Sequence, residues 1–235
     1  MYKWILLLLF PVVGYSQNTF QSATRIKAAS LPAGIKFRGK ATEIWQWKDK
    51  LGNNILVLSK VEPYKAKTNA SDESAYNVEL FAAQYVQAGS VYKTLWRLND
   101  LVKDCELDHT ADFIKGATTI TDLDKDSIAE TKVQYKLACR GDVSPADMKL
   151  IMHEDSLKYA LRGAMWVWAG GEQDSVFRVT EKDVNLEKMP PVKEEEYEKL
   201  FGRYQTEKDF KNAPSSFLVF ARKEWLKHAK EKFDE

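Results

Sequence analysis

Short runs of alternating apolar and polar residues, separated by polar turns, are the feature that most limits how this chain can fold. Three pairs of such runs are recognisable, over residues 35–58, 78–98 and 148–162. In the first pair, Trp45 and Trp47 fall on the same parity. Because successive side chains of a strand point to opposite faces, the pattern predicts antiparallel β-hairpins joined in chain order.

The alternation continues in residues 132–137, with apolar residues at the odd positions and Lys or Gln at the even ones. A strand of this kind is expected to bury one face and to expose the other. A further pair of strands is expected over 164–169 and 175–179, around two consecutive glycines. Repeated hairpins with short turns predict a meandering antiparallel sheet.

The pattern changes to helical spacing after Pro190 and Pro191. Residues 193–204 are expected to be helical, and Ser215 or Ser216 is expected to cap a final helix that packs against the sheet. The predicted fold class is therefore mainly β: an antiparallel meander of hairpins, forming a sandwich-like or partial-propeller sheet, with one or two C-terminal helices.

The first sixteen residues have the three parts of a secretory signal peptide. Lys3 supplies a positive charge, residues 4–13 are apolar, and Gly14 and Ser16 are small residues before a cleavage site. The apolar run is too short for a stable anchor, and no transmembrane segment is expected in the mature chain. We therefore expect an exported protein, located in the periplasm or at the cell surface.

Three divisions of the chain follow from these patterns. We expect a signal peptide over 1–16, an antiparallel β domain over 17–190, and a C-terminal helical segment over 191–235. A chain of 235 residues is long enough for one substantial core. Its net charge of only +1 argues against a nucleic-acid partner, which would require a clustered basic face.

Carboxylates at close, regular spacing mark the segment 122–130. Asp122, Asp124, Asp126 and Glu130 occupy positions 1, 3, 5 and 9 of this segment, just before a predicted strand. Carboxylates placed in this way repel one another, and a hard cation with oxygen ligands relieves the repulsion. The sequence predicts a calcium site, with the backbone carbonyl of Ile128 at position 7 as a further ligand.

The segment resembles the D-x-D-x-D-G-x-x-D calcium loops of integrin-type propeller blades, which also lead directly into a strand. It departs from them at Ser127, where glycine is usual, and at Glu130, which replaces aspartate. Ser127 is expected to adopt a left-handed backbone conformation. An EF-hand is excluded, because Val133 stands where that loop has a bidentate glutamate. The alternative is a solvated polar turn without an ion.

The two cysteines of the chain, Cys105 and Cys139, lie on either side of the carboxylate segment. A single pair of cysteines in an oxidising compartment usually forms a disulfide bond. We therefore predict a Cys105–Cys139 disulfide, with two buried thiols as the alternative.

No catalytic constellation is recognisable, and the sequence favours a protein that is not an enzyme. The chain has three histidines and lacks a nucleophile elbow, a phosphate-binding glycine loop and a dinucleotide fingerprint. A glycosidase needs only two carboxylates, but no pair can be singled out. Trp45 and Trp47 on one strand face are a candidate glycan platform, although core packing is the commoner role of such residues.

The strings DC-x-x-D, ITDLDKDSIAE, YKLACRGDVSP and MKLIMHEDSLKYALRG lie within residues 104–163. Together they resemble a family of exported Gram-negative bacterial proteins that carry the label surface polysaccharide biosynthesis protein. The resemblance covers less than a third of the chain. It implies an envelope location and a link to surface glycans, and it implies no catalytic residue.

These features favour an exported, calcium-binding, non-enzymatic binding or accessory protein of the cell envelope, whose partner would be an envelope glycan or protein. The alternative is a carbohydrate-active or surface-polysaccharide assembly factor. An exposed groove lined by Trp45 and Trp47 would favour the alternative, whereas burial of both rings would favour the accessory protein.

Overall fold

The computed structural model describes residues 20–67, 75–168, 170 and 175–232 of the chain. The expected signal peptide, residues 1–16, lies outside these described residues. Among the described residues, no helix is both long enough and apolar enough to cross a membrane.

The first sheet, sheet A, is an antiparallel meander in the order β1–β2–β3–β4–β5. Its strands are β1 (Thr24–Arg25), β2 (Lys40–Asp49), β3 (Gly52–Lys65), β4 (Tyr76–Ala88) and β5 (Val91–Cys105). Strands that follow each other in the chain are neighbours in the sheet, and two-residue turns join β2 to β3 and β4 to β5. Between β4 and β5 the turn consists of Gly89 and Ser90 alone, with Gly89 at a φ of 65°.

The second sheet, sheet B, has the order β10–β9–β8–β6, with the short β7 also paired to β8. Its strands are β6 (Asp108–Phe113), β7 (Thr119–Thr121), β8 (Glu130–Arg140), β9 (Asp147–Glu154) and β10 (Leu157–Ala164). The hairpin of β9 and β10 matches the hairpin expected over 148–162. Because β8 lies between β9 and the shorter strands, it is the central strand of this sheet.

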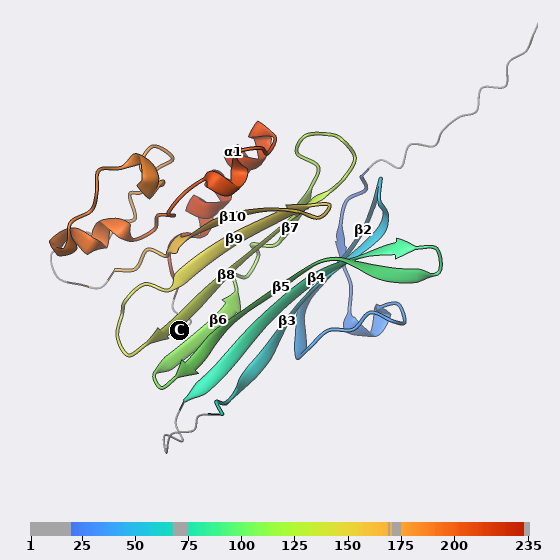
Figure 1. Cartoon of the computed structure of the whole chain (residues 1–235), viewed down its shortest axis with the longest axis horizontal. Coiled ribbons are helices and arrows are strands. Elements are labelled where there is room, and N and C mark those ends of the chain that lie inside the picture. Colours follow the sequence, from blue (N-terminus) through green and yellow to red (C-terminus); the bar gives the residue numbers. More distant parts are fainter. Residues whose placement is uncertain (1–19, 68–74, 169, 171–174, 233–235) are drawn as a thin grey trace, which may run out of the picture.

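The two sheets pack against each other around the main core. Figure 1 shows β3–β5 on one side of the molecule and β8–β10 on the other. Leu56 and Leu80 enter this core from sheet A, and Val133 and Ile151 enter it from sheet B. All four side chains are buried. The predicted mainly β, sandwich-like antiparallel architecture with a C-terminal helix is confirmed.

The outer face of sheet B is covered by the C-terminal part of the chain, in which helix α1 (Ser215–His228) lies along the sheet (Figure 1). This cover corrects the prediction that β8 exposes its polar face. Lys132 and Gln134 are each only 1% exposed, so both faces of the strand are buried. The polar face is tolerated inside because Lys132 Nζ donates to Glu224 Oε2 of α1 at 2.5 Å.

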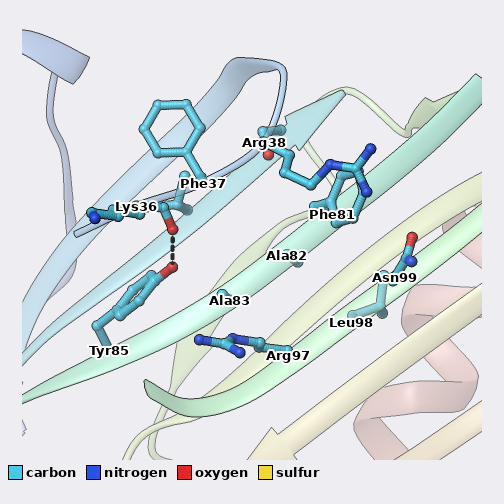
Figure 2. Close-up of a pocket in the computed structure, with 12 residues that line it drawn as sticks. Lys36, Phe37, Arg38, Phe81, Ala82, Ala83, Tyr85, Arg97, Leu98 and Asn99 are labelled. Carbon is cyan, nitrogen blue, oxygen red and sulfur yellow. Dashed lines mark hydrogen bonds between the residues drawn. The ribbon is translucent and has the colours of Figure 1, made fainter. Parts of the chain in front are cut away.

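The outer face of sheet A is covered by the segment that precedes β2. Ile26, Leu31 and Phe37 pack against a small second core, whose buried members are Ile44, Ile55, Val57 and Tyr85. Residues 36–38 cross this face close to β4, as Figure 2 shows. The molecule therefore has four layers: the N-terminal cover, sheet A, sheet B and the C-terminal cover.

Two predictions for the region after β10 are wrong. Of the pair expected over 164–169 and 175–179, only Ala164 lies in a strand, among the residues that the structure describes. Trp166 instead exchanges backbone hydrogen bonds with the chain end, donating to Ala229 O at 2.7 Å and accepting from Glu231 N at 2.8 Å. The helix expected over 193–204 is also not a regular helix.

The C-terminal cover is instead built from short 3₁₀ turns and the single α-helix that the described residues form. The 3₁₀ turns are η1 (Ala28–Ser30) in the N-terminal cover, and η2 (Leu186–Lys188), η3 (Glu194–Leu200) and η4 (Lys208–Phe210) in the C-terminal one. Glu196 leaves helical geometry within η3. The N-cap of α1 is Pro214, not a serine, and no side-chain hydrogen bond caps this helix.

Candidate metal centre

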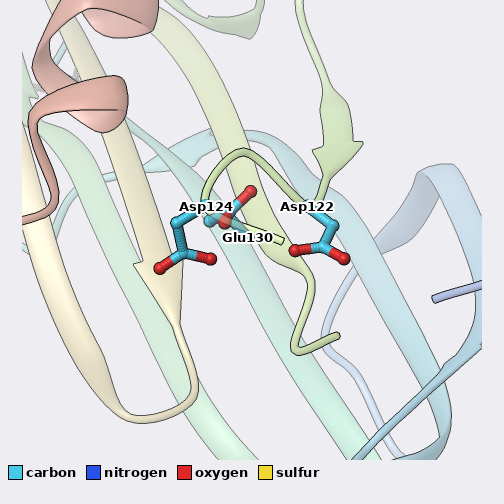
Figure 3. A group of neighbouring side chains, drawn as sticks. All are labelled: Asp122, Asp124 and Glu130. Carbon is cyan, nitrogen blue, oxygen red and sulfur yellow. The ribbon is translucent and has the colours of Figure 1, made fainter. Parts of the chain in front are cut away.

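The loop between β7 and β8 gathers the carboxylates that the sequence singles out. Asp122, Asp124 and Glu130 each offer one carboxylate oxygen, and these oxygens lie within 4.8 Å of one another. Figure 3 shows the three side chains meeting under the turn of the loop. Asp124 and Asp126 form a second such group with Glu154, a residue of β9.

The loop curls because its aspartates bond to its own backbone. Asp124 Oδ1 accepts the N–H of Asp126 at 3.3 Å, and Asp126 Oδ1 accepts the N–H of Ile128 at 2.7 Å. Lys125 and Ser127 have positive φ angles of 67° and 71°. The left-handed conformation predicted for Ser127 is thus confirmed, and it keeps the carboxylates on one curve.

Sheet A holds the far side of this loop. The backbone N–H of Lys50, in the β2–β3 turn, donates to Ser127 O at 2.8 Å. The N–H of Ala129 donates to Asp49 Oδ2 at 3.2 Å. Asp49 is fully buried, and the Trp47 indole is one of its further donors, at 2.9 Å. The loop therefore connects two strands of sheet B, β7 and β8, and its backbone is bonded to the β2–β3 end of sheet A.

Glu130 is the most buried member of the cluster, at 1% exposure. Its carboxylate accepts the Thr121 hydroxyl at 2.8 Å and the Leu123 N–H at 3.0 Å. Burial raises the pKa of Glu130 to about 7, although these hydrogen bonds act in the opposite direction. Loss of solvent is thus not fully compensated by the groups that surround this carboxylate.

Glu154 belongs to the second group, with Asp124 and Asp126, and was not predicted from the sequence. It lies directly opposite Glu130 in the register of β8 and β9. Burial raises the pKa of Glu154 to about 7, and the negative charges of Asp124 and Asp126 add to the effect. Glu154 could be found only from the pairing register of β8 and β9, because the spacing of residues within the loop does not point to it.

Two carboxylate oxygens of the cluster are buried without a partner. Asp122 Oδ1 and Glu154 Oε1 make no hydrogen bond among the residues that the structure describes. Buried acceptors are nearly always paired, so these two oxygens are where a cation or water would complete the site. The role of the Ile128 carbonyl stays a prediction, since the structure fixes only the hydrogen bond of its N–H.

The predicted disulfide between Cys105 and Cys139 is confirmed, with its sulfur atoms 2.02 Å apart. Cys105 ends β5 in sheet A and Cys139 lies near the end of β8 in sheet B. Glu130, at the start of β8, is nine residues away, which is about 30 Å along a strand. The covalent link and the carboxylate loop therefore join the two sheets at opposite ends of β8.

The two tryptophans considered as a glycan platform have different environments. Trp47 is 4% exposed in the main core, so its ring cannot stack on a sugar. Trp45 is partly buried against the same core, and the Arg25 guanidinium lies 4.6 Å from its ring centroid. A platform formed by both rings is therefore absent from this face.

No family model, no curated protein and no solved structure matches this chain. The resemblance to a surface polysaccharide family and to propeller calcium loops accordingly stays a prediction. The function of the chain must be inferred from the site itself, which combines oxygen ligands, a curved backbone and unpaired buried carboxylate oxygens.

Proposed function

We propose that this protein is an exported, calcium-binding, non-enzymatic binding or accessory protein of the cell envelope. In this proposal Asp122, Asp124, Asp126 and Glu130 hold one calcium ion, with Glu154 as a ligand from the neighbouring strand. The observation that carries the proposal is the approach of the oxygens of Asp122, Asp124 and Glu130 to within 4.8 Å of one another.

Electrostatic repulsion supports a bound cation. The two groups together comprise five carboxylates. Burial is the main reason that the pKa values of Glu130 and Glu154 are raised to about 7, and the negative charges of neighbouring aspartates add to both shifts. A divalent cation would offset this repulsion and would give the unpaired oxygens of Asp122 and Glu154 a partner.

The donor set supports calcium over other metals. Both groups of potential ligands consist of aspartate and glutamate alone. Among the described residues, no histidine or cysteine lies close enough to join either group. Zinc favours nitrogen and sulfur ligands, whereas calcium takes six to eight oxygens in flexible geometry. Magnesium demands a smaller octahedral shell and gives up its water reluctantly.

The position of the loop supports a structural role for the ion. The loop contacts sheet A through Ser127 and Ala129, so an ion that orders it would also fasten sheet A to sheet B. The disulfide fastens the sheets at the other end of β8. A disulfide is typical of oxidising compartments, which favours export.

Calorimetry and thermal unfolding test the proposal. Calcium added to the chelator-treated protein should bind with a stoichiometry of one, and at a hundredfold excess over Kd it should stabilise the fold by about 2.7 kcal/mol. For a domain of this length that corresponds to a rise in melting temperature of roughly 5–10 °C. Magnesium should produce a smaller shift at the same concentration.

A matched pair of variants identifies the site. Asp124→Asn removes one ligand charge from the exposed side of the loop and should abolish most of the calcium-dependent shift. Asp108→Asn changes an equally exposed aspartate on β6 and should leave the shift unchanged. Equal calcium responses in the two variants, or a melting temperature that chelator does not change, would contradict the proposal.

A further inference from the structure

A hollow lies on the outer face of sheet A, and none of the residues that line it belongs to the carboxylate loop. Its volume is about 370 Å³, and it opens between residues 36–38 and the strands β3, β4 and β5. This volume is within the range of small-molecule pockets, roughly 300–1,000 Å³. Figure 2 shows the side chains that surround it.

The hollow exists because Ala83 occupies the middle of an otherwise bulky row. Phe81 and Tyr85 flank it on the same face of β4, and its cross-strand neighbours are Val57 and Arg97. A methyl group between two aromatic rings leaves space that larger side chains would fill. The floor is therefore apolar, formed mainly by Val57, Ala83 and the Phe81 ring.

The N-terminal cover passes over this face at close range because of a glycine. Gly39 has a φ of +70°, and a Cβ at this position would lie 2.2 Å from Lys60 O. Residues 36–38 are held there by the Tyr85 hydroxyl, which donates to Lys36 O at 2.7 Å (Figure 2). The hollow is thus a built feature with a fixed roof at one end.

Ser59 provides a polar group in the apolar floor. It lines the hollow, and it is only 1% exposed. Its Oγ has no hydrogen-bond partner among the residues that the structure describes. Buried hydroxyl groups are normally paired, so this one is available to a ligand atom that enters the hollow.

The rim of the hollow is positively charged. Lys36, Arg38 and Arg97 line it, and no carboxylate does so in the described part of the chain. Arg38 is bonded to Glu79 at 3.2 and 3.3 Å and lies over the Phe81 ring. Arg97 donates to the Thr94 hydroxyl at 3.1 Å and forms no ion pair with the described carboxylates.

We propose that this hollow binds an organic carboxylate with an apolar body. The carboxylate pairs with Arg97 at the rim, the apolar body lies over Val57 and Ala83, and the Ser59 hydroxyl bonds to the ligand. Arginine suits this role because its guanidinium matches a carboxylate in two parallel hydrogen bonds. The proposal does not depend on calcium, because none of these residues belongs to the carboxylate loop.

Titration calorimetry with octanoate and 3-phenylpropionate tests the proposal and separates an aliphatic from an aromatic ligand. Each titration is made with calcium and again with chelator, so that failure of the metal site does not affect the result. Octanol serves as the uncharged analogue of octanoate. Saturable binding of at least one acid is expected under both conditions.

Two substitutions locate the binding. Arg97→Gln should weaken binding of the acid roughly tenfold and leave octanol binding unchanged, since it removes a charge-assisted hydrogen bond. Ala83→Leu should fill the hollow and weaken binding of acid and alcohol alike, also by at least roughly tenfold. Lys93→Gln is the matched control, because Lys93 is an exposed residue of β5, the strand of Arg97, and does not line the hollow.

Circular dichroism shows whether each variant is folded. If Ala83→Leu does not fold, the result for Arg97→Gln alone decides the proposal. The proposal is overturned if neither acid binds saturably. It is equally overturned if a folded Arg97→Gln or Ala83→Leu variant binds the acid as tightly as the Lys93→Gln control.

Discussion

The buried ion pair between sheet B and helix α1 gives the sharpest prediction for stability. Lys132 Nζ lies 2.5 Å from Glu224 Oε2, and the side chains are 1% and 11% exposed. Removing one partner of a buried pair costs about 3–5 kcal/mol, because the other charge stays buried without compensation. The two partners should nevertheless respond unequally, since Glu224 also pairs with Lys227 at the solvent edge.

Glu224→Gln should lower the free energy of unfolding by about 3 kcal/mol, since it leaves the Lys132 ammonium in the interior without a counter-charge. Lys132→Met should cost only about 1 kcal/mol, because an apolar side chain of similar length fills the same space. Glu224 then keeps Lys227, at 3.2 Å, as its partner. The asymmetry is the part of the prediction that depends on this structure.

Urea unfolding at pH 7, with the disulfide intact, measures both costs. Lys227→Met removes an exposed partner of the same carboxylate and should change the free energy of unfolding by less than about 0.5 kcal/mol. A second readout is His228, whose pKa is lowered to about 4 by burial and then by Lys132. Its pKa should rise in Lys132→Met. A Glu224→Gln variant that costs no more than Lys132→Met would refute the reasoning.

Three further predictions concern the covalent link, the acid stability and the leader. Mutation of Cys105 and Cys139 to Ala should lower the free energy of unfolding in urea by about 4 kcal/mol, from the 34-residue separation on the chain-entropy model. Burial raises the pKa of Glu207, but hydrogen bonds from Arg222 and other donors outweigh burial and hold it at about 2. Its stabilising contribution is therefore complete above about pH 4.5 and is lost as the pH falls toward 2, so Glu207→Gln should flatten the acid limb of the stability profile. N-terminal sequencing of the exported protein should begin at Gln17, and retention of residue 1 would contradict the expected cleavage.

Most of the sheet structure could be predicted from the sequence, because the two strands of a hairpin are close to each other in the chain. Residues of a hairpin are close in the chain, so alternation and turn residues together define both strands and their connection, as in β9 and β10. The carboxylate loop was predictable for the same reason. Its four carboxylates lie within nine consecutive residues, and the backbone conformation of Ser127 follows from the curve they form.

The features that could not be predicted from the sequence depend on contacts between segments that are distant in the chain. The polar side of β8 looked exposed because Glu224, the partner of Lys132, is 92 residues further along the chain. Glu154 was missed because strand register brings it opposite Glu130. The hollow beside Ala83 likewise requires knowing which strands are neighbours and where the N-terminal cover crosses them.

The most direct test of the central claim is a crystal structure of the protein grown with calcium. We expect one ion within about 2.3–2.6 Å of carboxylate oxygens from Asp122, Asp124 and Glu130. The unpaired oxygens of Asp122 and Glu154 should gain a partner, either the ion or a water bound to it. A loop that contains only water at millimolar calcium, with its carboxylates pointing into solvent, would contradict a calcium site.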